Sequence, residues 1–296
     1  MSISAKDVMK LREMTGAGMM DCKEALTDTA GDFDQAVDFL RKKGLSKAAK
    51  KADRTTNEGL VHALVAADGK SGAMLEFNCE TDFVARNEEF VKIVETLTKQ
   101  AASAVGVNVS AEWLSEQPYG LDPAVSVQGG IANAIAKLGE NMKLARAVRY
   151  ERAGSGIVYA YIHPGARTGV LIDVSTGTAA TTGKAEFLQV VRDLSMQVAA
   201  MNPKCVRRED ADLSLVEKEK EIFRAQLVES GKPAQVIDKI VDGKMEKFFS
   251  ESCLVEQAFI KDQDKKVQDV VAAAAKSLGD TIVVNRFTRY GLGETA

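Results

Sequence analysis

The amino-acid sequence predicts an α+β protein, with three short helices at the N-terminus and two related α+β units after them. Apolar residues recur at helical spacing through the first 55 residues, which predicts the helices. Two later segments repeat one pattern of strands and helix, which predicts the related units. A Glu- and Lys-rich stretch at residues 210–249 has a narrow apolar seam, which predicts a helical hairpin inserted in the second unit.

The N-terminal helices are expected to begin and end at local signals. Ser4 begins the first helix, whose apolar face holds Val8, Leu11 and Met14. The break at Thr15–Gly18 leads to a second helix from Met19 to about Thr29. Asp32 caps a third helix, which Gly44 is expected to end. The spacing resembles the small ubiquitin-associated fold, and so short a module is marginal on its own.

Two features of this module admit both a structural and a functional interpretation. Met19 and Met20 lie at a helix start, where they suit either core packing or a binding surface, because methionine is adaptable. The segment Ser46–Arg54 is rich in lysine, which would suit contact with RNA or the ribosome. A short basic run of this kind is usually a solvated hinge, and that interpretation is favoured.

An internal repeat relates two later parts of the chain. Gly59–Val65 aligns with Gly156–Ile162, so the residue numbers differ by 97 (156 − 59). The same difference aligns Gly72–Phe77 with Gly169–Val174. Each copy has the pattern of strand, turn, strand, loop and helix. A single hairpin is marginal in water, so we expect each helix to cover its own hairpin.

The repeat sets the expected domain boundaries. Residues 1–55 form the helical module with its basic linker, residues 56–147 the first α+β subdomain, and residues 148–296 the second. The stretch between residues 106 and 130 contains Trp113 and two prolines, and it is expected to be an irregular excursion.

The second subdomain is expected to contain the hairpin and a closing strand. Apolar residues of the hairpin recur at coiled-coil-like spacing: Val216, Phe223, Leu227, Ile237, Ile240 and Phe248. Ser230–Pro233 turns the chain, and a rigid structural arm is favoured over an arm that contacts or regulates a partner. After it we expect a strand near Ala258–Ile260, a helix from about Lys265 to Ser277 capped by Asp264, and a last strand over Thr281–Tyr290.

Composition argues against several function classes. The net charge of −3 leaves no whole-protein basic field for gripping nucleic acid. Four cysteines without paired spacing and two histidines give no support for a zinc site or a disulfide framework, so four reduced cysteines are expected. The sequence has no phosphate-binding loop, dinucleotide fingerprint or nucleophile elbow, so we predict no catalytic residue, metal or cofactor. An enzyme stays open as a rival, to be tested by a nucleotide-hydrolysis assay. No signal-peptide, transit or membrane-spanning pattern is present, and the expected location is the cytoplasm.

The loop Asn78–Asn87 carries the most informative residues. It lies between the strand-like run Ala73–Phe77 and a helix that begins near Glu88, and Thr81 or Asp82 can cap that helix. A cap does not account for Phe83. Its ring can pack back on the core beside the capping carboxylate, or both side chains can be presented to a partner.

The amino-acid sequence of this loop resembles that of a known protein family. Asn78-Cys-Glu-Thr-Asp-Phe-Val84, together with Thr15-Gly-Ala-Gly-Met-Met-Asp-Cys-Lys-Glu-Ala-Leu26, closely resembles bacterial elongation factor Ts, and the likeness runs through most of the chain. That family exchanges nucleotide on the GTPase elongation factor Tu. The resemblance implies that Thr81, Asp82, Phe83 and Val84 enter the GTPase near its magnesium site, so that GDP leaves and GTP rebinds.

The resemblance also implies secondary contacts with the partner. These are expected at the N-terminal helices and at the tip of the second hairpin, through Leu11, Met19, Met20, His163 and Arg167. His163 is a lone histidine, more often structural than functional, with no neighbouring motif that would make it a catalytic base. Elongation factor Tu is the expected partner, both GDP-bound and nucleotide-free. A 2:2 assembly with it is compatible with the resemblance, and no direct contact with nucleic acid is expected.

Overall fold

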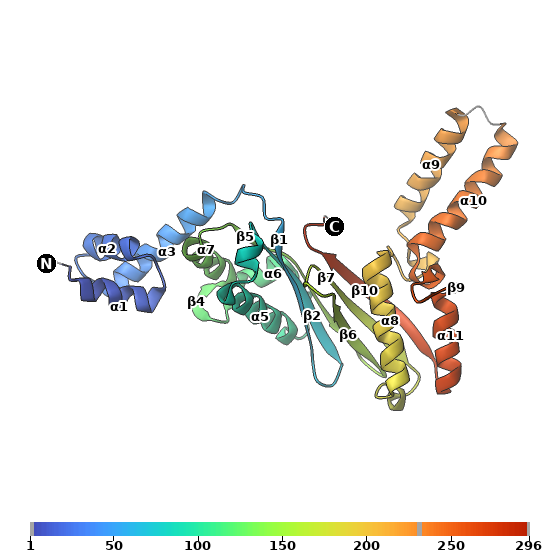
Figure 1. Ribbon diagram of the computed structural model, residues 1–296, viewed down its shortest axis with the longest axis horizontal. Helices are drawn as coiled ribbons and strands as arrows, with labels where there is room; N and C mark the ends of the chain where they lie inside the picture. Colours follow the sequence, from blue (N-terminus) through green and yellow to red (C-terminus); the bar gives the residue numbers. More distant parts are fainter. Residues whose placement is uncertain (1–2, 230–232, 295–296) are drawn as a thin grey trace. The chain divides into compact units, whose positions relative to one another are not determined.

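The computed structural model describes residues 3–229 and 233–294, and the chain divides into two units. The first unit takes in the chain up to Leu64, Ala73–Arg149 and the last segment from Tyr290. The second unit takes in Val65–Gly72 and Tyr150–Arg289. Helices and strands are mixed in both units, which confirms the α+β class (Figure 1).

Three N-terminal helices open the first unit: α1 (Ala5–Thr15), α2 (Met19–Asp28) and α3 (Phe33–Ala49). Ser4 and Asp7 form a reciprocal capping box on α1, and the Asp32 side chain caps α3. Their common core consists of Val8, Leu11, Cys22, Ala25, Leu26 and Ala36. These helix starts agree with the local capping signals of the sequence.

The expected end of the third helix at Gly44 is wrong. Helix α3 continues to Ala49, and Gly44 is buried where a Cβ would lie 3.1 Å from Oδ1 of Asn133. Asn133 belongs to α7 (Val127–Leu138), so the missing side chain lets α3 and α7 pack closely. Gly44 therefore permits a helix contact and does not end the helix.

The basic segment Ser46–Arg54 is also more ordered than a solvated hinge. Its first residues belong to α3. Lys47 Nζ lies 2.7 Å from Asp21 Oδ2, and Lys51 Nζ donates to the Gly139 carbonyl at 2.5 Å. These partners fix the segment against its own unit and occupy part of its positive charge.

The first unit is built on a three-stranded sheet. Strands β1 (Glu58–Val65), β2 (Ser71–Cys79) and β5 (Met142–Glu151) follow the order β1-β2-β5, so β2 is central and almost wholly buried. Helices α5 (Glu88–Ser103) and α7 pack on one face of the sheet (Figure 1). Phe77 of β2 and Phe90 of α5 lie at the centre of the core, with ring centroids 5.1 Å apart.

Residues 106–130 are not an irregular excursion. They include α6 (Ala111–Glu116), the two-stranded ribbon of β3 (Pro118–Tyr119) and β4 (Asp122–Ser126), and the start of α7. The ring of Tyr119 is buried against Gly130, where a Cβ would come within 2.3 Å of it. This close packing of a ring on the backbone gives the segment a fixed structure. The prolines in the sequence had instead indicated an irregular segment.

The second unit has its own three-stranded sheet. Strands β6 (Gly156–Ile162), β7 (Thr168–Thr176) and β10 (Ile282–Gly291) follow the order β10-β7-β6. The β6–β7 hairpin pairs in continuous register from Gly156↔Ser175 to Ile162↔Gly169. Helices α8 (Ala185–Met201) and α11 (Val267–Leu278) pack on one face of this sheet (Figure 1).

Short elements complete the second unit. They are the 3-10 turns η1 (Ala179–Thr181), η2 (Arg208–Asp210) and η3 (Leu254–Glu256), and the ribbon of β8 (Ala258–Phe259) and β9 (Asp262–Lys266). The expected cap of α11 is wrong, because Asp264 lies in β9 and Lys266 precedes the helix. Asp269 accepts the backbone N–H of Lys266 at 3.1 Å.

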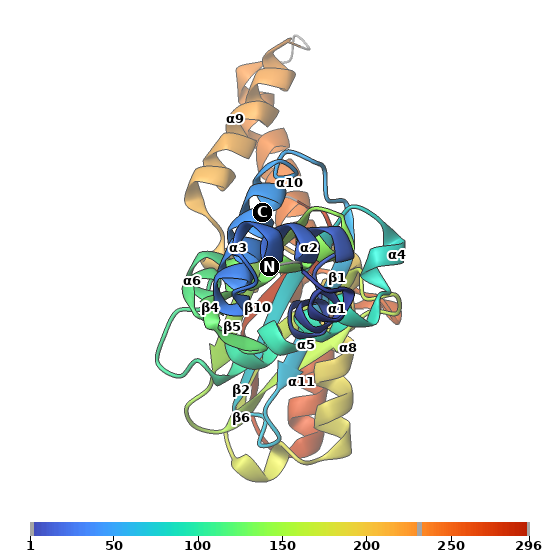
Figure 2. The ribbon, with the colours of Figure 1, turned by 90° about the vertical axis from the view of Figure 1, so that its left-hand side faces the viewer.

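The two units have the same order of elements. Each has a β-hairpin, a short helical turn, a long helix, a two-stranded ribbon, a helix and a last strand. The second unit differs by a helical hairpin, α9 (Leu213–Glu229) and α10 (Ala234–Ser252), which lie side by side in Figures 1 and 2. Its buried seam consists of Val216, Leu227, Ile237, Val241 and Met245. Of the predicted turn at Ser230–Pro233, residues 230–232 lie outside the described residues, and Pro233 directly precedes α10.

Within the described part of the chain, no helix is both long enough and apolar enough to span a membrane.

Candidate partner interface

The loop after β2 contains a short helix that the sequence did not predict. Thr81 caps α4 (Asp82–Ala85), with its Oγ1 accepting the backbone N–H of Val84 at 3.4 Å. Asn87 caps the following helix α5. The expected single cap is therefore split between two residues, and α4 lies at the edge of its unit in Figure 2.

The Phe83 side chain points into solvent. It is 83% exposed, whereas Val84 is half-buried and Ala85 is buried against the core of the first unit. The interpretation that Phe83 packs back on its own core is therefore wrong. An exposed ring on an anchored turn is available to a partner, and aromatic side chains often dominate an interface.

Asp82 lies beside the ring and is only weakly engaged. Its Oδ2 is 3.0 Å from Nη2 of Arg86, one helical turn later, and both side chains are largely in water. Such an i,i+4 pair on the surface contributes about 0.3–0.5 kcal/mol. The carboxylate can therefore exchange Arg86 for a group of a partner at little cost.

The loop backbone is held from the side by Glu140, which the sequence analysis did not single out. Its Oε2 accepts the N–H groups of Glu80 at 3.2 Å and Thr81 at 3.0 Å, and its Oε1 accepts the Thr81 hydroxyl at 2.6 Å. Cys79 donates its S–H to the Thr81 carbonyl at 3.2 Å. Burial raises the pKa of Cys79 to about 12, so the thiol stays protonated and able to donate.

The methionines of α2 lie on the surface as a binding role requires. Met20 is 73% exposed and Met19 is also exposed, and α1 adds the exposed Met9 and Met14. Leu11 is placed differently from the expectation for it. With 0% exposure it packs in the core of the three helices, so its side chain offers no surface to a partner in this structure.

The tip of the second hairpin is exposed as expected. His163 and Arg167 are both exposed, on either side of a turn in which Ala166 N donates to the His163 carbonyl at 2.9 Å. Nδ1 of His163 lies 2.9 Å from the Tyr161 hydroxyl. This contact orients the ring and brings no carboxylate, serine or cysteine to it.

Comparison with known proteins decides the family. A profile described as "Elongation factor TS" matches residues 80–294. Elongation factor Ts of Aquifex aeolicus (strain VF5) is 46% identical over 297 residues, covering 99% of each chain. Elongation factor Ts of Clostridium botulinum (strain Alaska E43) is 44% identical, covering 99% of this chain and 93% of its own. That of Nitratidesulfovibrio vulgaris (strain DP4) is 43% identical, with 100% and 98% covered.

The chain belongs to the elongation factor Ts family. The resemblance found in the loop and in the N-terminal helices is thereby confirmed over nearly the whole chain. Membership implies a role in translation elongation, through nucleotide exchange on elongation factor Tu.

A hollow of about 280 Å³ beside the start of α2 is lined in part by Lys43 and Lys47. Its charges are already paired, because Asp21 accepts Lys43 at 2.9 Å and Lys47 at 2.7 Å. The hydrogen bond from Lys47 is the main reason that the pKa of Asp21 lies below its ordinary value. The hollow gives no support to RNA binding as a rival function.

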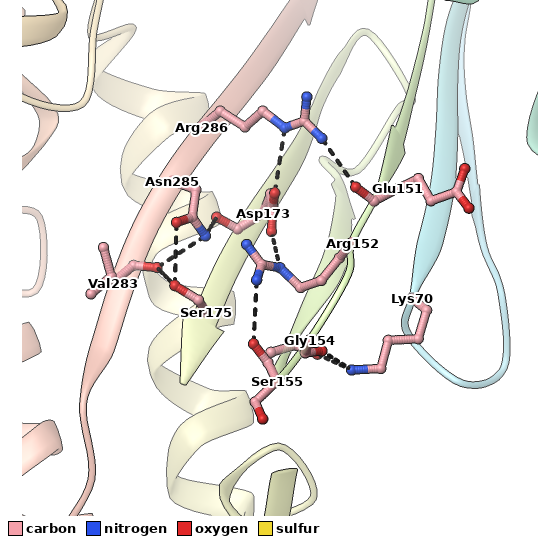
Figure 3. Close-up of polar contacts among 11 residues, drawn as sticks. Lys70, Glu151, Arg152, Gly154, Ser155, Asp173, Ser175, Val283, Asn285 and Arg286 are labelled. Carbon is pink, nitrogen blue, oxygen red and sulfur yellow. Dashed lines mark hydrogen bonds and ion pairs between the residues drawn. The ribbon is translucent and has the colours of Figure 1, made fainter. Parts of the chain in front are cut away.

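Buried charges in each sheet form a second group of polar residues that sequence reasoning missed. Figure 3 shows Asp173 between Arg152 and Arg286, with Oδ2 of Asp173 3.4 Å from Nε of Arg286. In the first unit, the Glu76 carboxylate accepts a hydrogen bond from Nε of Arg146 at 2.7 Å. Both carboxylates are buried and satisfied by these partners, so they stabilise the sheets and are not placed to act on a substrate.

The structure brings together two cysteines that are far apart in the sequence. Sγ of Cys205 lies 3.5 Å from Sγ of Cys253, and all four cysteines are free thiols. Burial raises the pKa of both, to about 12 for Cys253, which disfavours the reactive thiolate. Among the described residues, no group of three His, Cys, Asp or Glu side chains is arranged to hold a metal ion.

Proposed function

We propose that this chain is a guanine-nucleotide exchange factor for elongation factor Tu, and that it acts through binding and not through a chemical step of its own. The observation that carries the proposal is Phe83, an exposed ring on a firmly held turn. Aromatic side chains of this kind are often the residues that dominate an interface.

Release of GDP follows from the place at which the ring would bind. In a GTPase the diphosphate is held by a phosphate-binding loop and by Mg²⁺. A ring packed near the metal displaces the segment that orders its water shell, and Mg²⁺ tolerates distorted geometry poorly. GDP then loses the counter-charge on its phosphates and leaves, so that GTP can rebind. Asp82 offers an acceptor to groups freed by the movement, and Val84 and Thr81 anchor the loop behind it.

For exchange, the factor needs only to bind the nucleotide-free GTPase more tightly than the nucleotide-bound GTPase. A factor that binds the nucleotide-free GTPase more tightly lowers the affinity of the GTPase for nucleotide, and nucleotide lowers the affinity for the factor equally. GTP binding therefore expels the factor. No acid, base or metal of this chain takes part in that cycle.

We assign docking of the GTPase to residues other than those of the Phe83 loop. The N-terminal helices form a ubiquitin-associated-like module that presents Met19 and Met20, with Leu11 supporting the surface from beneath. His163 and Arg167 at the tip of the second hairpin make secondary contacts. Broad contacts of this kind hold the complex together, while Phe83 acts on the nucleotide site.

Duplication of one α+β unit is also part of this proposal. Its support is the shared order of elements and the matching buried pairs, Glu76 with Arg146 and Asp173 with Arg286. Both units would then descend from one scaffold, of which only the first copy carries the aromatic loop.

The test is release of a fluorescent GDP analogue from preloaded elongation factor Tu in excess GTP. Adding this chain should accelerate release, while the chain alone should hydrolyse no GTP. Absence of acceleration would overturn the proposal. Light scattering of the nucleotide-free complex decides between 1:1 and 2:2 assembly, and fractionation of cells tests the expected cytoplasmic location.

A further inference from the structure

The turn that backs the Phe83 loop lies far from it in the sequence. Gly139 ends α7 in the left-handed conformation (φ 85°), and Glu140 follows directly, before β5. Glu140 places both carboxylate oxygens against the loop, through the three hydrogen bonds to Glu80 and Thr81. Ionised acceptors make stronger hydrogen bonds than neutral ones.

The contact is reciprocal, so the two segments hold each other. Oε1 of Glu80 accepts the backbone N–H of Asn141 at 2.6 Å. Asn141 in turn donates its side-chain amide to the Arg54 carbonyl at 3.0 Å, and Lys51 donates to the Gly139 carbonyl. The turn is thus anchored on both sides and can act as a fixed support.

The Thr81 hydroxyl transmits this support to Phe83. A hydroxyl has one proton, and in Thr81 it is donated to Glu140 at 2.6 Å. The lone pairs of the same oxygen therefore face the N–H of Val84, and Thr81 caps α4 by accepting this hydrogen bond. Because Phe83 lies within that single turn of helix, the direction of its ring depends on the orientation of Thr81.

We propose that Glu140 is a positioning residue for nucleotide exchange: by holding Thr81 it sets the direction in which Phe83 is presented to the GTPase. This inference rests on the proposed function, because it assumes that the Phe83 ring acts on the nucleotide site. Glu140 would act through its hydrogen bonds to Glu80 and Thr81 within this chain.

The second unit contains a matched arrangement without the aromatic ring. Asp280 follows Gly279 between α11 and β10, and its Oδ2 accepts the N–H of Thr178 at 3.1 Å and the hydroxyls of Thr178 and Thr181 at 3.0 and 2.5 Å. The segment Thr178–Thr182 holds only threonine and alanine. Removing the Asp280 carboxylate therefore disturbs the same kind of loop in a place where no aromatic ring depends on it. The Asp280 variants thus serve as matched controls.

The experiment compares four full-length variants: Glu140→Gln, Glu140→Ala, Asp280→Asn and Asp280→Ala. For each, the maximal rate of fluorescent GDP release at saturating factor is measured together with the factor concentration that gives half of it. Thermal melting reports folding, and the isosteric Gln and Asn variants keep the comparison interpretable where an alanine variant unfolds.

Glu140→Ala is expected to lower the maximal release rate by about 10- to 100-fold, since small misplacements of an acting group cost this much. Glu140→Gln keeps one acceptor oxygen and should lose less. The half-saturating concentration should change little, because docking lies elsewhere. Both Asp280 variants should release GDP at the parental maximal rate. A normal rate in both Glu140 variants, or equal slowing by the Asp280 variants, would overturn the inference.

A double variant separates this inference from the proposed function. If Glu140 acts through Phe83, then Glu140→Ala adds no further slowing to Phe83→Ala, and additive slowing refutes the positioning role. If Phe83→Ala alone releases GDP normally, the proposed function itself fails. If Phe83→Ala is slow while Glu140→Ala is normal, only the positioning role fails.

Discussion

Phe83→Ala should slow nucleotide release strongly while leaving the free protein almost as stable as before. Phe83 is 83% exposed, so folding covers about one-sixth of a side chain whose surface is roughly 200 Å². At about 25 cal/mol per Å², that area contributes less than ~1 kcal/mol to the free energy of unfolding. A phenylalanine buried in the core would instead cost about 3–5 kcal/mol on truncation.

The expected effect in the complex is larger. Full burial of a phenylalanine ring against the GTPase is worth about 1.5–3 kcal/mol. If this contact forms only as the nucleotide site distorts, its loss raises the barrier to release by the same amount. Each 1.36 kcal/mol is tenfold in rate, so release at saturating factor should slow about 10- to 100-fold.

Stopped-flow release of fluorescent GDP, beside thermal melting of the free variant, measures both quantities. Val105→Ala is a matched control, because Val105 is 72% exposed in the same unit but lies after α5, away from the loop. The reasoning is refuted if Phe83→Ala melts far below the parent, or if it releases GDP as fast as the parent and the control.

Three further outcomes are expected. Met20→Ala should melt like the parent but raise the Kd for the nucleotide-free GTPase about tenfold by calorimetry, as for an interface hot spot; an unchanged Kd would remove Met20 from the docking surface. Replacing Leu213–Phe249 with a short linker should leave the release rate unchanged, whereas failure of the chain to fold would make α9 and α10 part of the core. The pKa of Cys79 and of Cys253 is about 12, so at pH 8 both should be alkylated far more slowly in the native protein than in denaturant, and equal rates would contradict their burial.

Short-range chemistry made the helix starts predictable. Ser4 and Asp32 are read correctly because a cap depends on residues within one turn of it. Gly44 is misread because the same residue type ends helices and permits close packing, and the distant Asn133 decides between the two. Residues 106–130 are misread for a similar reason, since the burial of Tyr119 against Gly130 overrides the local proline signal.

The loop was predictable in its residues but not in its geometry. The sequence left Phe83 with two interpretations, and only its exposure in the folded chain chose one. Glu140 is 59 residues from Thr81 and 60 from Glu80, and no local pattern encodes such a contact. The contact between the free thiols of Cys205 and Cys253, which are 48 residues apart, is likewise set by the fold.

The place of Tyr290 in the first unit has a consequence for synthesis on the ribosome. Arg146 stacks on the Tyr290 ring at 4.4 Å and donates to the Gly291 carbonyl, while Gly293 donates its N–H to the buried Glu76. These partners are translated after every residue of the second unit. A nascent chain that has already emerged past Arg149 therefore waits for about 140 more residues, roughly 7–30 s of elongation, before these contacts to its first sheet can form. Until then the buried Glu76 carboxylate lacks the hydrogen bond that it accepts from Gly293.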